Sequence, residues 1–419
     1  MKPLFLISCP FDTYSGYGAR SRDVVKAIIE TDKYRVKLIS QPWGNTRFDF
    51  CNDHPEWKFL LDYTLTKDLT DKPEFWAQIT VPNEFKPMGK YNIGFTAGIE
   101  TTLVNAEWVE GMNRMDLNIV SSEHSKKAFL NSRYEKKNQE GKVLQTIQIE
   151  KPIEILFEGV NLDTYFPTKE PCLIDFNVKE SFAYLFVGHW LQGEIGQDRK
   201  NVGLLVKAFF ETFKNKPKQP ALILKTSGAN SSYMDRNEII RKINVIKNSC
   251  EGKLPNVYLL HGDFTDEEMN SLYNHSKVKS MISLTKGEGF GRPLLEFTLT
   301  KKPIIATGWS GHMDFLKPEF NVLIGGKLEN VHSSAANTML LKESQWFTPA
   351  HAEIGKALKS VFENHKKHAE LGKRQGHYSK TNFSWGDMKN KLDNILSTNT
   401  PVFPTEIKLT IPELNLPTL

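Results

Sequence analysis

Three glycines alternate with other residues in the segment from Thr285 to Glu296, which reads TKGEGFGRPLLE. An apolar run at 281–284 predicts a strand before the segment, and Pro293 suits the first turn of a helix after it, where a missing N–H is harmless. Glycines let peptide N–H groups approach a ligand closely, and a helix N-terminus adds partial positive charge. The segment is therefore a candidate anion site, suited to a diphosphate.

Two carboxylates accompany these glycines, Glu288 inside the loop and Glu296 on the helix that follows. Carboxylates beside an anion site are unfavourable unless they bind hydroxyl groups rather than phosphate. A tight turn alone would explain the glycines, but it would not explain the carboxylates. Arg292 stands where a GxGxxG motif needs its third glycine, so a dinucleotide dehydrogenase is disfavoured.

The elements that must position this loop follow an alternating pattern. Short apolar runs alternate with amphipathic stretches along most of the 419 residues, which predicts an α/β fold with parallel sheets. The length favours two domains of about 150–200 residues, and the pattern places their boundary near 160–180. We predict strands at 3–8, 34–40, 91–95, 117–120, 153–157, 181–188, 221–225, 257–261, 279–284 and 303–307, helices at 21–30, 123–130 and 201–214, and a hairpin or excursion at 134–151.

The composition disfavours several classes of protein. No apolar run approaches the 18 or more residues of a membrane helix, and no secretory signal opens the chain. The four cysteines are scattered without a CxxC pair, which predicts a reduced, cytoplasmic protein without a disulfide framework or zinc site. The net charge of +5 allows acidic ligands such as nucleotides but does not demand nucleic acid.

Several motifs together resemble one enzyme family. Glu288 and Glu296 form the E-x7-E pair of retaining glycosyltransferases with the GT-B fold, and they resemble in particular glycosyltransferase family 4. Further matching segments occur in the family's order: IEILFEGVNLDTYFP at 153–167, DRKNVGLLVKAFF at 198–210, HGDFTDEEMNSLY at 261–273, TGWSGHMDFL at 307–316 and FSW at 383–385. The resemblance covers about half of the chain, almost all of it in the second domain.

This resemblance implies a GT-B fold, in which two Rossmann-like, doubly wound domains face a cleft. It assigns an N-terminal acceptor-binding domain to 1–165 and a C-terminal domain that binds a nucleotide-sugar donor to 166–382. A helix at 383–397 is expected to cross back to the first domain, and a Pro/Thr-rich tail is expected at 398–419.

The family's roles can be carried over to matching residues. By resemblance, Glu288 stabilises the positive charge that develops at the anomeric carbon, and Glu296 accepts hydrogen bonds from the ribose hydroxyls. Arg199 and Lys200 neutralise the diphosphate leaving group, where negative charge develops as the glycosidic bond breaks. The peptide N–H groups expected to bind sugar hydroxyls or phosphate are those around Gly289, Phe290 and Gly291.

Five further residues are weaker candidates. Gly16 and Gly18 in YSGYGARS resemble the glycine loop that approaches the donor phosphates, although any strand-to-helix turn favours glycine. Lys225 ends a predicted strand and is either a donor ligand or an exposed strand-end lysine. His189 stands where the family often has an arginine and is either a donor ligand or a spectator. Glu100 replaces a histidine of many members and either serves the acceptor or caps the next helix.

The expected mechanism follows from these placements. The sequence has no Asp-x-Asp pair, so we expect no metal-bridged diphosphate and no cofactor beyond the nucleotide-sugar substrate. One carboxylate at the sugar is not the pair that a double displacement requires. The family expectation is front-face substitution with retention, with UDP as the preferred nucleotide.

The acceptor is the partner that the sequence defines least. Residues 95–127 also look like glycosyltransferases of large tailed bacteriophages, some of which glycosylate hydroxylated cytosines in DNA; a phage enzyme would act in the host cytoplasm. A DNA acceptor would suit the basic cluster of Lys126, Lys127, Arg133, Lys136, Lys137 and Lys142. Acidic residues interrupt this cluster, so a solvated surface with a saccharide or protein acceptor is the alternative.

Two functions outside transfer chemistry share the fold. A GT-B sugar-nucleotide epimerase is expected to lack the RKN segment together with E-x7-E, and both are present here. An inactive binding protein is expected to have lost Glu288 or Lys200, and neither is lost.

Overall fold

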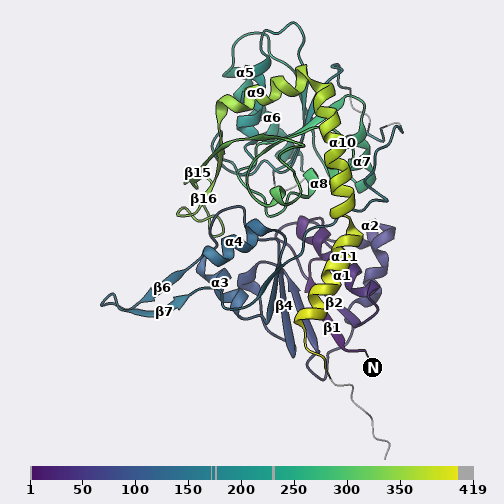
Figure 1. The fold of residues 1–419 in the computed structure, drawn as a ribbon, viewed down its shortest axis with the longest axis vertical. Coiled ribbons are helices and arrows are strands. Elements are labelled where there is room, and N and C mark those ends of the chain that lie inside the picture. Colours follow the sequence, from purple (N-terminus) through teal and green to yellow (C-terminus); the bar gives the residue numbers. More distant parts are fainter. Residues whose placement is uncertain (1, 171, 175–176, 229–231, 404–419) are drawn as a thin grey trace, which may run out of the picture.

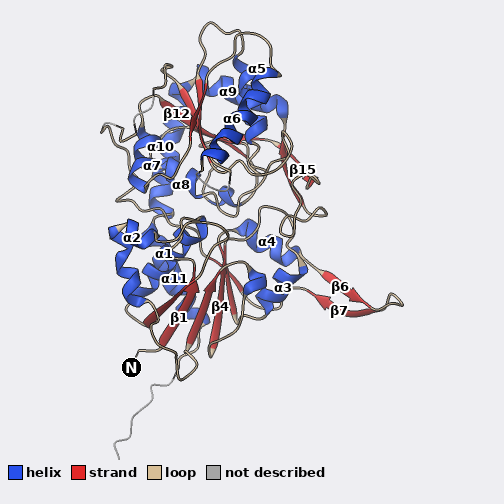
Figure 2. Ribbon diagram, turned by 180° about the vertical axis from the view of Figure 1, so that it is seen from behind, coloured by secondary structure: helices blue, strands red, loops and turns tan. Residues whose placement is uncertain are grey.

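The computed structural model describes residues 2–170, 172–174, 177–228 and 232–403. The chain forms two α/β halves stacked end to end (Figure 1). Each half contains one six-stranded sheet in which all neighbouring strands are parallel (Figure 2). The predicted α/β fold with parallel sheets is confirmed.

The first sheet uses strands from the N-terminal part of the chain, in the order β2-β1-β3-β4-β5-β8. Its strands are β1 (Leu4–Cys9), β2 (Arg35–Ser40), β3 (Phe75–Ile79), β4 (Tyr91–Thr96), β5 (Leu117–Val120) and β8 (Ile153–Ile155). The connecting helices are α1 (Gly16–Glu30), α2 (Phe50–Asp53), η1 (Pro55–Tyr63), η2 (Pro82–Glu84), α3 (Ala106–Asn113) and α4 (Glu123–Asn131).

The second sheet has the strand order β11-β10-β9-β12-β13-β14, which is a doubly wound order that reverses between β9 and β12. Its strands are β9 (Ala183–Val187), β10 (Ala221–Lys225), β11 (Val257–Leu260), β12 (Val278–Ser283), β13 (Ile304–Thr307) and β14 (Val322–Ile324). The helices around it are α5 (Val202–Phe213), α6 (Tyr233–Asn248), α7 (Asp266–Asn274), α8 (Arg292–Thr298), η3 (Gly311–Asp314) and α9 (His351–Glu363).

Several strands of the two sheets are mostly apolar and buried along most of their length. The first four residues of β10, with the sequence ALILK, are all buried, and so is every residue of β13. Continuous apolar runs rather than alternating ones are typical of parallel strands covered on both faces. This burial is why the short apolar runs of the sequence mark most strands correctly.

Two long helices connect the halves at the C-terminal end. Helix α10 (His365–Asn382) packs against α8 and α9, whereas α11 (Trp385–Asn399) packs against α1 of the first half. Ser384 caps α11 at the point where the chain passes between the halves. The predicted crossing helix is therefore present, and it extends to Asn399, into the segment expected as a tail at 398–419; residues 404–419 of that tail lie outside the described residues.

Two antiparallel ribbons complete the described chain. The ribbon of β6 (Tyr134–Lys137) and β7 (Val143–Ile147) projects away from the first half (Figures 1 and 2). Of the two alternatives predicted for 134–151, a hairpin or an excursion, the structure shows a hairpin, whose second strand ends at Ile147. The ribbon of β15 (Gly326–Asn330) and β16 (Gln345–Pro349) lies in the second half, near the boundary between the halves (Figure 1).

Most predicted bounds differ from those of the structure by one or two residues, but one helix begins five residues earlier than predicted. The helix predicted to begin at residue 21 begins at Gly16, because the side chain of Ser15 accepts a hydrogen bond from the N–H of Gly18 and caps it. The glycines of YSGYGARS therefore form the first turn of α1 rather than a loop before it.

Candidate active site

The strand order of the second sheet reverses between β9 and β12, so the loops that follow these two strands lie at the reversal. His189 belongs to the loop after β9, and the glycine loop at 285–291 follows β12. In open α/β sheets, ligands bind at the carboxyl ends of the strands at such a reversal. The glycine loop singled out in the sequence therefore lies where a doubly wound sheet binds its ligand.

Residues 199–201 lie directly beside this loop. The N–H of Lys286 donates to the carbonyl oxygen of Arg199 at 2.8 Å. The side-chain amide of Asn201 donates to the carbonyl oxygen of Leu284 at 2.9 Å. Asn201 has a φ of 53°, a left-handed conformation that Asn tolerates, and it turns the chain into α5. These bonds hold two predicted donor segments together.

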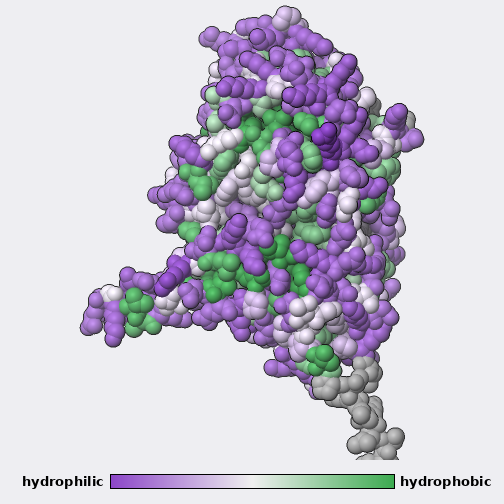
Figure 3. All heavy atoms as spheres, in the orientation of Figure 1, coloured by the Kyte–Doolittle hydropathy of each residue, from purple (hydrophilic) through white to green (hydrophobic). Residues whose placement is uncertain are grey.

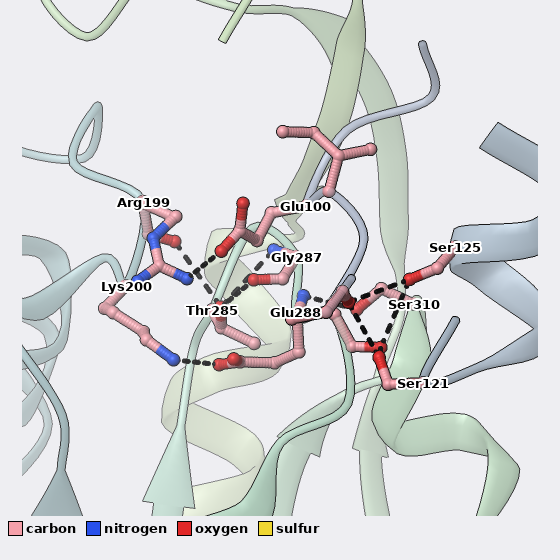
Figure 4. A network of polar contacts seen from close by, with 12 residues as sticks. Glu100, Ser121, Ser125, Arg199, Lys200, Thr285, Gly287, Glu288 and Ser310 are labelled. Atoms are coloured by element: carbon pink, nitrogen blue, oxygen red, sulfur yellow. Dashed lines mark hydrogen bonds and ion pairs between the residues drawn. The ribbon is translucent and has the colours of Figure 1, made fainter. Parts of the chain in front are cut away.

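Lys200 and Glu288 form an ion pair beside the glycine loop (Figure 4). Their side chains are only 12% and 9% exposed, so water screens the two charges weakly. Burial would raise the pKa of Glu288, but Lys200 and Arg199 outweigh burial and hold this pKa below its ordinary value. Glu288 is therefore ionised at neutral pH.

A second ion pair joins the two halves of the molecule. An Nη atom of Arg199 lies 2.5 Å from a carboxylate oxygen of Glu100, which comes from the loop after β4 in the first half (Figure 4). Burial would lower the pKa of Arg199, but Glu100 and Glu288 together raise it. Asn105 caps the helix that follows Glu100, so the alternative that Glu100 caps this helix is wrong.

The glycines at 287 and 289 serve a contact between the halves. A Cβ atom on Gly287 would overlap the carbonyl oxygen of Glu100, and one on Gly289 would overlap that of Ala97. The hydroxyl of Ser121 donates to the carbonyl oxygen of Gly289 at 3.1 Å (Figure 4). These glycines allow close approach of backbone to backbone, whereas the sequence predicted close approach to a ligand.

Phe290 and Gly291 complete the loop. Phe290 is buried, with its ring centroid 5.1 Å from that of Phe315, so its side chain belongs to the core. Gly291 has a φ of 100°, which glycine adopts without strain, and it begins α8. The predicted role of these two residues therefore concerns their peptide N–H groups alone.

Glu296 belongs to a separate network. Its carboxylate accepts hydrogen bonds from the hydroxyl of Tyr273 and from Nε of Arg292, each at 3.1 Å. Arg292 also contacts Asp23 of α1 at 2.6 Å and so joins the two halves. Burial raises the pKa of Glu296 to about 7 despite the nearby Arg292. The two carboxylates of the E-x7-E pair thus have opposite pKa shifts.

Lys225 and His189 lie near Lys200, Lys225 as a further cation and His189 as a ring that is neutral at neutral pH. Burial lowers the pKa of His189, and the positive charges of Arg199, Lys200 and Lys225 lower it further. Nδ1 of His189 lies 3.1 Å from the hydroxyl of Ser227. Lys225 is not an exposed strand-end lysine: its ammonium donates to the carbonyl oxygen of Gly262 at 2.6 Å. The structure therefore brings four predicted basic groups together.

Gly16 and Gly18 differ in what surrounds them. A Cβ atom on Gly18 would overlap the carbonyl oxygen of Thr13, whereas one on Gly16 would meet open space. Gly18 is therefore required for packing of the turn. Gly16 is the glycine that a ligand could approach.

This difference makes a prediction for two alanine variants. Gly18→Ala should lower the free energy of unfolding by about 1–3 kcal/mol, because the added methyl group has no room. Gly16→Ala should not lower it, since alanine is the better helix former by about 0.5–1 kcal/mol. Urea unfolding followed by circular dichroism measures both values, and equal destabilisation by the two substitutions would contradict the difference.

Two residues close to Glu288 and Arg292 were not predicted. His312 is buried, with Nε2 2.6 Å from the carbonyl oxygen of Thr307, and its Nδ1 is among the buried atoms without a partner in the described part of the chain. It lies in TGWSGHMDFL, a matching segment, so the motif could have indicated it. Asp23 lies in α1, outside the motifs, and no sequence signal points to it.

Searches for metal and membrane features used the described residues only. Within 2–170, 172–174, 177–228 and 232–403, no group of three His, Cys, Asp or Glu side chains is arranged to hold a metal ion. Among the helices in the same ranges, none combines the length and the apolar character that crossing a membrane requires.

Comparison with known proteins gives structural neighbours but no sequence relatives. No family model and no curated protein matches the chain. Anabaena HepE, crystallised with UDP-glucose, is 13% identical with a TM-score of 0.58, and the alignment covers 94% of this chain and 100% of HepE. Sucrose-phosphate synthase of Thermosynechococcus elongatus is 13% identical with a TM-score of 0.59, covering 95% and 99%.

A glycosyltransferase from Rickettsia africae gives a similar result, with 13% identity, a TM-score of 0.58 and coverage of 95% and 98%. Such low identity supports the fold and leaves the activity to be argued from the site. The expected arrangement of two Rossmann-like domains is confirmed. The chain has the GT-B fold of these glycosyltransferases.

Proposed function

We propose that the chain is a retaining glycosyltransferase, similar to family 4, that transfers a sugar from a nucleotide-sugar, preferably UDP-linked, to a hydroxyl group. The observation that carries the proposal is the buried Lys200–Glu288 pair, beside Arg199, at the strand reversal of the second sheet. It combines positive charge for a diphosphate with an ionised carboxylate for a sugar. The fold of enzymes crystallised with UDP or UDP-glucose agrees with this chemistry.

The basic groups supply what a diphosphate leaving group requires. Arg199 and Lys200 are paired with Glu100 and Glu288, so a bound donor would draw these cations onto its phosphate oxygens. His189 and Lys225 lie close enough to add hydrogen bonds or charge. Stabilising the negative charge that develops on the departing phosphate accelerates cleavage of the glycosidic bond.

The carboxylates suit two different parts of the donor. Glu288, held ionised by its basic neighbours, would stabilise positive charge at the anomeric carbon. Glu296 would accept hydrogen bonds from the ribose, and N–H groups at Gly289, Phe290 and Gly291 would contact the sugar or phosphate. Retention follows from front-face substitution, in which the departing phosphate helps to deprotonate the acceptor hydroxyl.

For the acceptor we propose a hydroxylated cytosine in DNA, bound by the first half while the second half binds the donor. Exposed basic residues after the first-half helix α4 and the net charge of +5 support a polyanionic acceptor. A saccharide or a protein hydroxyl is the alternative, and acidic residues among the basic ones favour it.

One experiment tests donor and acceptor together. The protein is incubated with UDP-sugars and duplex DNA that contains hydroxymethylcytosine, the DNA is digested to nucleosides for mass spectrometry, and UDP release is measured in parallel. We expect a pentose or hexose added to the modified cytosine. UDP release with unmodified nucleosides would reject the DNA acceptor and retain the transferase. NMR of the anomeric proton in the product tests retention.

We also propose that transfer needs no metal ion and no cofactor; the proximity of Arg199 and Lys200, which would neutralise the diphosphate, supports this. Prior treatment with EDTA, followed by removal of the chelator, should therefore leave turnover unchanged within about twofold. The assay is UDP release with and without added Mg²⁺ or Mn²⁺. A large loss that Mg²⁺ or Mn²⁺ restores would contradict this part of the proposal.

A further inference from the structure

A two-stranded ribbon projects from the first half of the molecule, and residues 133–147, which contain it, are here called the arm (Figures 1 and 2). Between residues 135 and 145, every side chain except that of Asn138 is exposed. A lone two-stranded ribbon is marginally stable at best. The exposed part of the arm therefore adds little to the stability of the protein, and its function must be sought in contacts with another molecule.

The root of the arm is fixed to the body. Tyr134 and Ile147 face each other across the ribbon, both partly buried, and both pack on the apolar cluster beneath α3. The hydroxyl of Tyr134 donates to the carbonyl oxygen of Val104. The arm therefore has a defined direction, although its distal part stands in solvent.

The distal part combines positive charge with exposed apolar groups. The arm contains four basic residues, Arg133, Lys136, Lys137 and Lys142, and two acidic residues, Glu135 and Glu140. Leu144 is 62% exposed and Val143 is 43% exposed, and Figure 3 shows an apolar patch on the projecting ribbon within hydrophilic surroundings. Such a surface suits a polyanion whose interior is apolar, which describes the phosphates and stacked bases of DNA.

Helix α4 links the arm to the candidate active site. Ser121 and Ser125, at the start of α4, donate to the carbonyl oxygen of Gly289 at 3.1 and 3.5 Å, and the arm follows the end of α4. At 1.5 Å per residue along α4 and about 3.3 Å per extended residue beyond it, the tip lies at most about 40 Å from Gly289. A duplex that reaches both places therefore needs at most about 12 base pairs between them, at about 3.4 Å per base pair.

We propose that the arm binds the sugar–phosphate backbone of duplex DNA beside the base that is glycosylated. This inference rests on the DNA acceptor proposed above. A two-stranded ribbon fits the major groove, where lysines can contact phosphates on either side and an exposed leucine can contact the methyl group of a thymine. The arm thereby adds affinity for long acceptors, while the chemistry stays at Glu288 and Lys200.

The test compares two triple variants of the full chain. In the arm variant, Lys136, Lys137 and Lys142 are replaced by Ser. In the control variant the same change is made at Lys366, Lys367 and Lys373, three exposed lysines of α10 in the second half. Exposed lysines on the surface can be replaced without loss of folding, and circular dichroism verifies this for both proteins.

Binding is measured by fluorescence anisotropy with a duplex of about 24 base pairs and with a single strand of about four nucleotides, both containing hydroxymethylcytosine. The arm variant should bind the duplex at least about tenfold more weakly, and its salt dependence should fall by about 2–3 in slope, since each phosphate contact contributes about 0.9. Binding of the short strand, and UDP release with the short strand as acceptor, should remain unchanged in both variants.

Each outcome decides a separate point. Weaker duplex binding by the arm variant alone supports the proposal that the arm binds DNA. Equal binding by both variants and the unchanged protein, or equal losses in both variants, overturns this proposal but not the proposed DNA acceptor. If the unchanged protein releases UDP but neither binds nor modifies DNA, the DNA acceptor itself is rejected and the arm proposal with it.

Discussion

Glu288→Ala and Lys200→Ala should each lower turnover at least about a hundredfold, because each change removes an electrostatic interaction with the transition state. Glu288 would stabilise the positive charge at the sugar, and Lys200 would stabilise the negative charge on the departing diphosphate. The two charges are buried together, so water cannot replace either one effectively. Steady-state UDP release at saturating donor measures the effect.

Stability must be separated from chemistry in this experiment. Removing one partner of a buried ion pair leaves the other charge without compensation, which destabilises a protein by about 3–5 kcal/mol. The double variant Lys200→Met with Glu288→Gln removes both charges and should recover most of that loss in urea unfolding. Turnover should stay low in the double variant, because neither charge is available to the transition state.

A partly buried lysine outside the candidate site provides the control. Lys302 donates hydrogen bonds to the carbonyl oxygens of Tyr273 and His275, and burial lowers its pKa to about 7. Lys302→Met should reduce stability while leaving the turnover of the folded protein within about twofold of the original. If Glu288→Ala or Lys200→Ala turns over as fast as the unchanged protein, the donor site is wrongly assigned.

Burial decides which elements could be predicted from sequence. Strand β10 is visible because its buried residues are uniformly apolar. Strand β3 is also buried throughout, but Gln78 interrupts its apolar run. That amide is satisfied locally: it accepts from the N–H of Lys86 at 2.6 Å and donates to the carbonyl oxygen of Glu84 at 3.3 Å. A polar residue satisfied by a neighbouring turn conceals a buried strand.

Local motifs indicated both members of the Lys200–Glu288 pair in the candidate site. Glu288 lies in a contiguous motif, and Lys200 lies in a second motif that the fold brings to it. Gly287 and Gly289 show how far the sequence can be used for prediction. Glycines indicate that another group approaches the backbone closely, but they do not indicate whether that group is a ligand or, as here, another stretch of backbone. The bond from Arg292 to Asp23 joins residues 269 positions apart, so only the closed arrangement of the two halves reveals it.

Arg292→Met is the second substitution for which we expect a large effect, here on stability and donor binding. Arg292 contacts Asp23 and Glu296, whose side chains are 7% and 10% exposed. Burial would lower the pKa of Arg292, but these two carboxylates raise it well above its ordinary value. Without the guanidinium, two buried carboxylates lose their counter-charge, so the free energy of unfolding should fall by about 3–5 kcal/mol.

Donor binding should weaken for a related reason. The pKa of Glu296 is about 7 with Arg292 present, and removing the cation raises it further. A protonated carboxyl is a poorer acceptor for ribose hydroxyls than a carboxylate. The KM for the nucleotide-sugar should therefore rise at least about tenfold at neutral pH, and the rise should become smaller at alkaline pH as Glu296 ionises.

The pH dependence of stability provides an independent measurement on Glu296. Its pKa is raised in the folded protein, so its contribution to stability is complete below about pH 4.5 and is lost as the pH rises through about 7. Relative to Glu296→Gln, the unchanged protein should therefore lose up to about 3 kcal/mol between pH 5 and pH 8 in urea unfolding. A constant difference across this range would show that Glu296 is not buried as described.

If Arg292→Met changed neither stability nor KM, the bridge from Asp23 through Arg292 to Glu296 would have no role in joining the halves or binding the ribose.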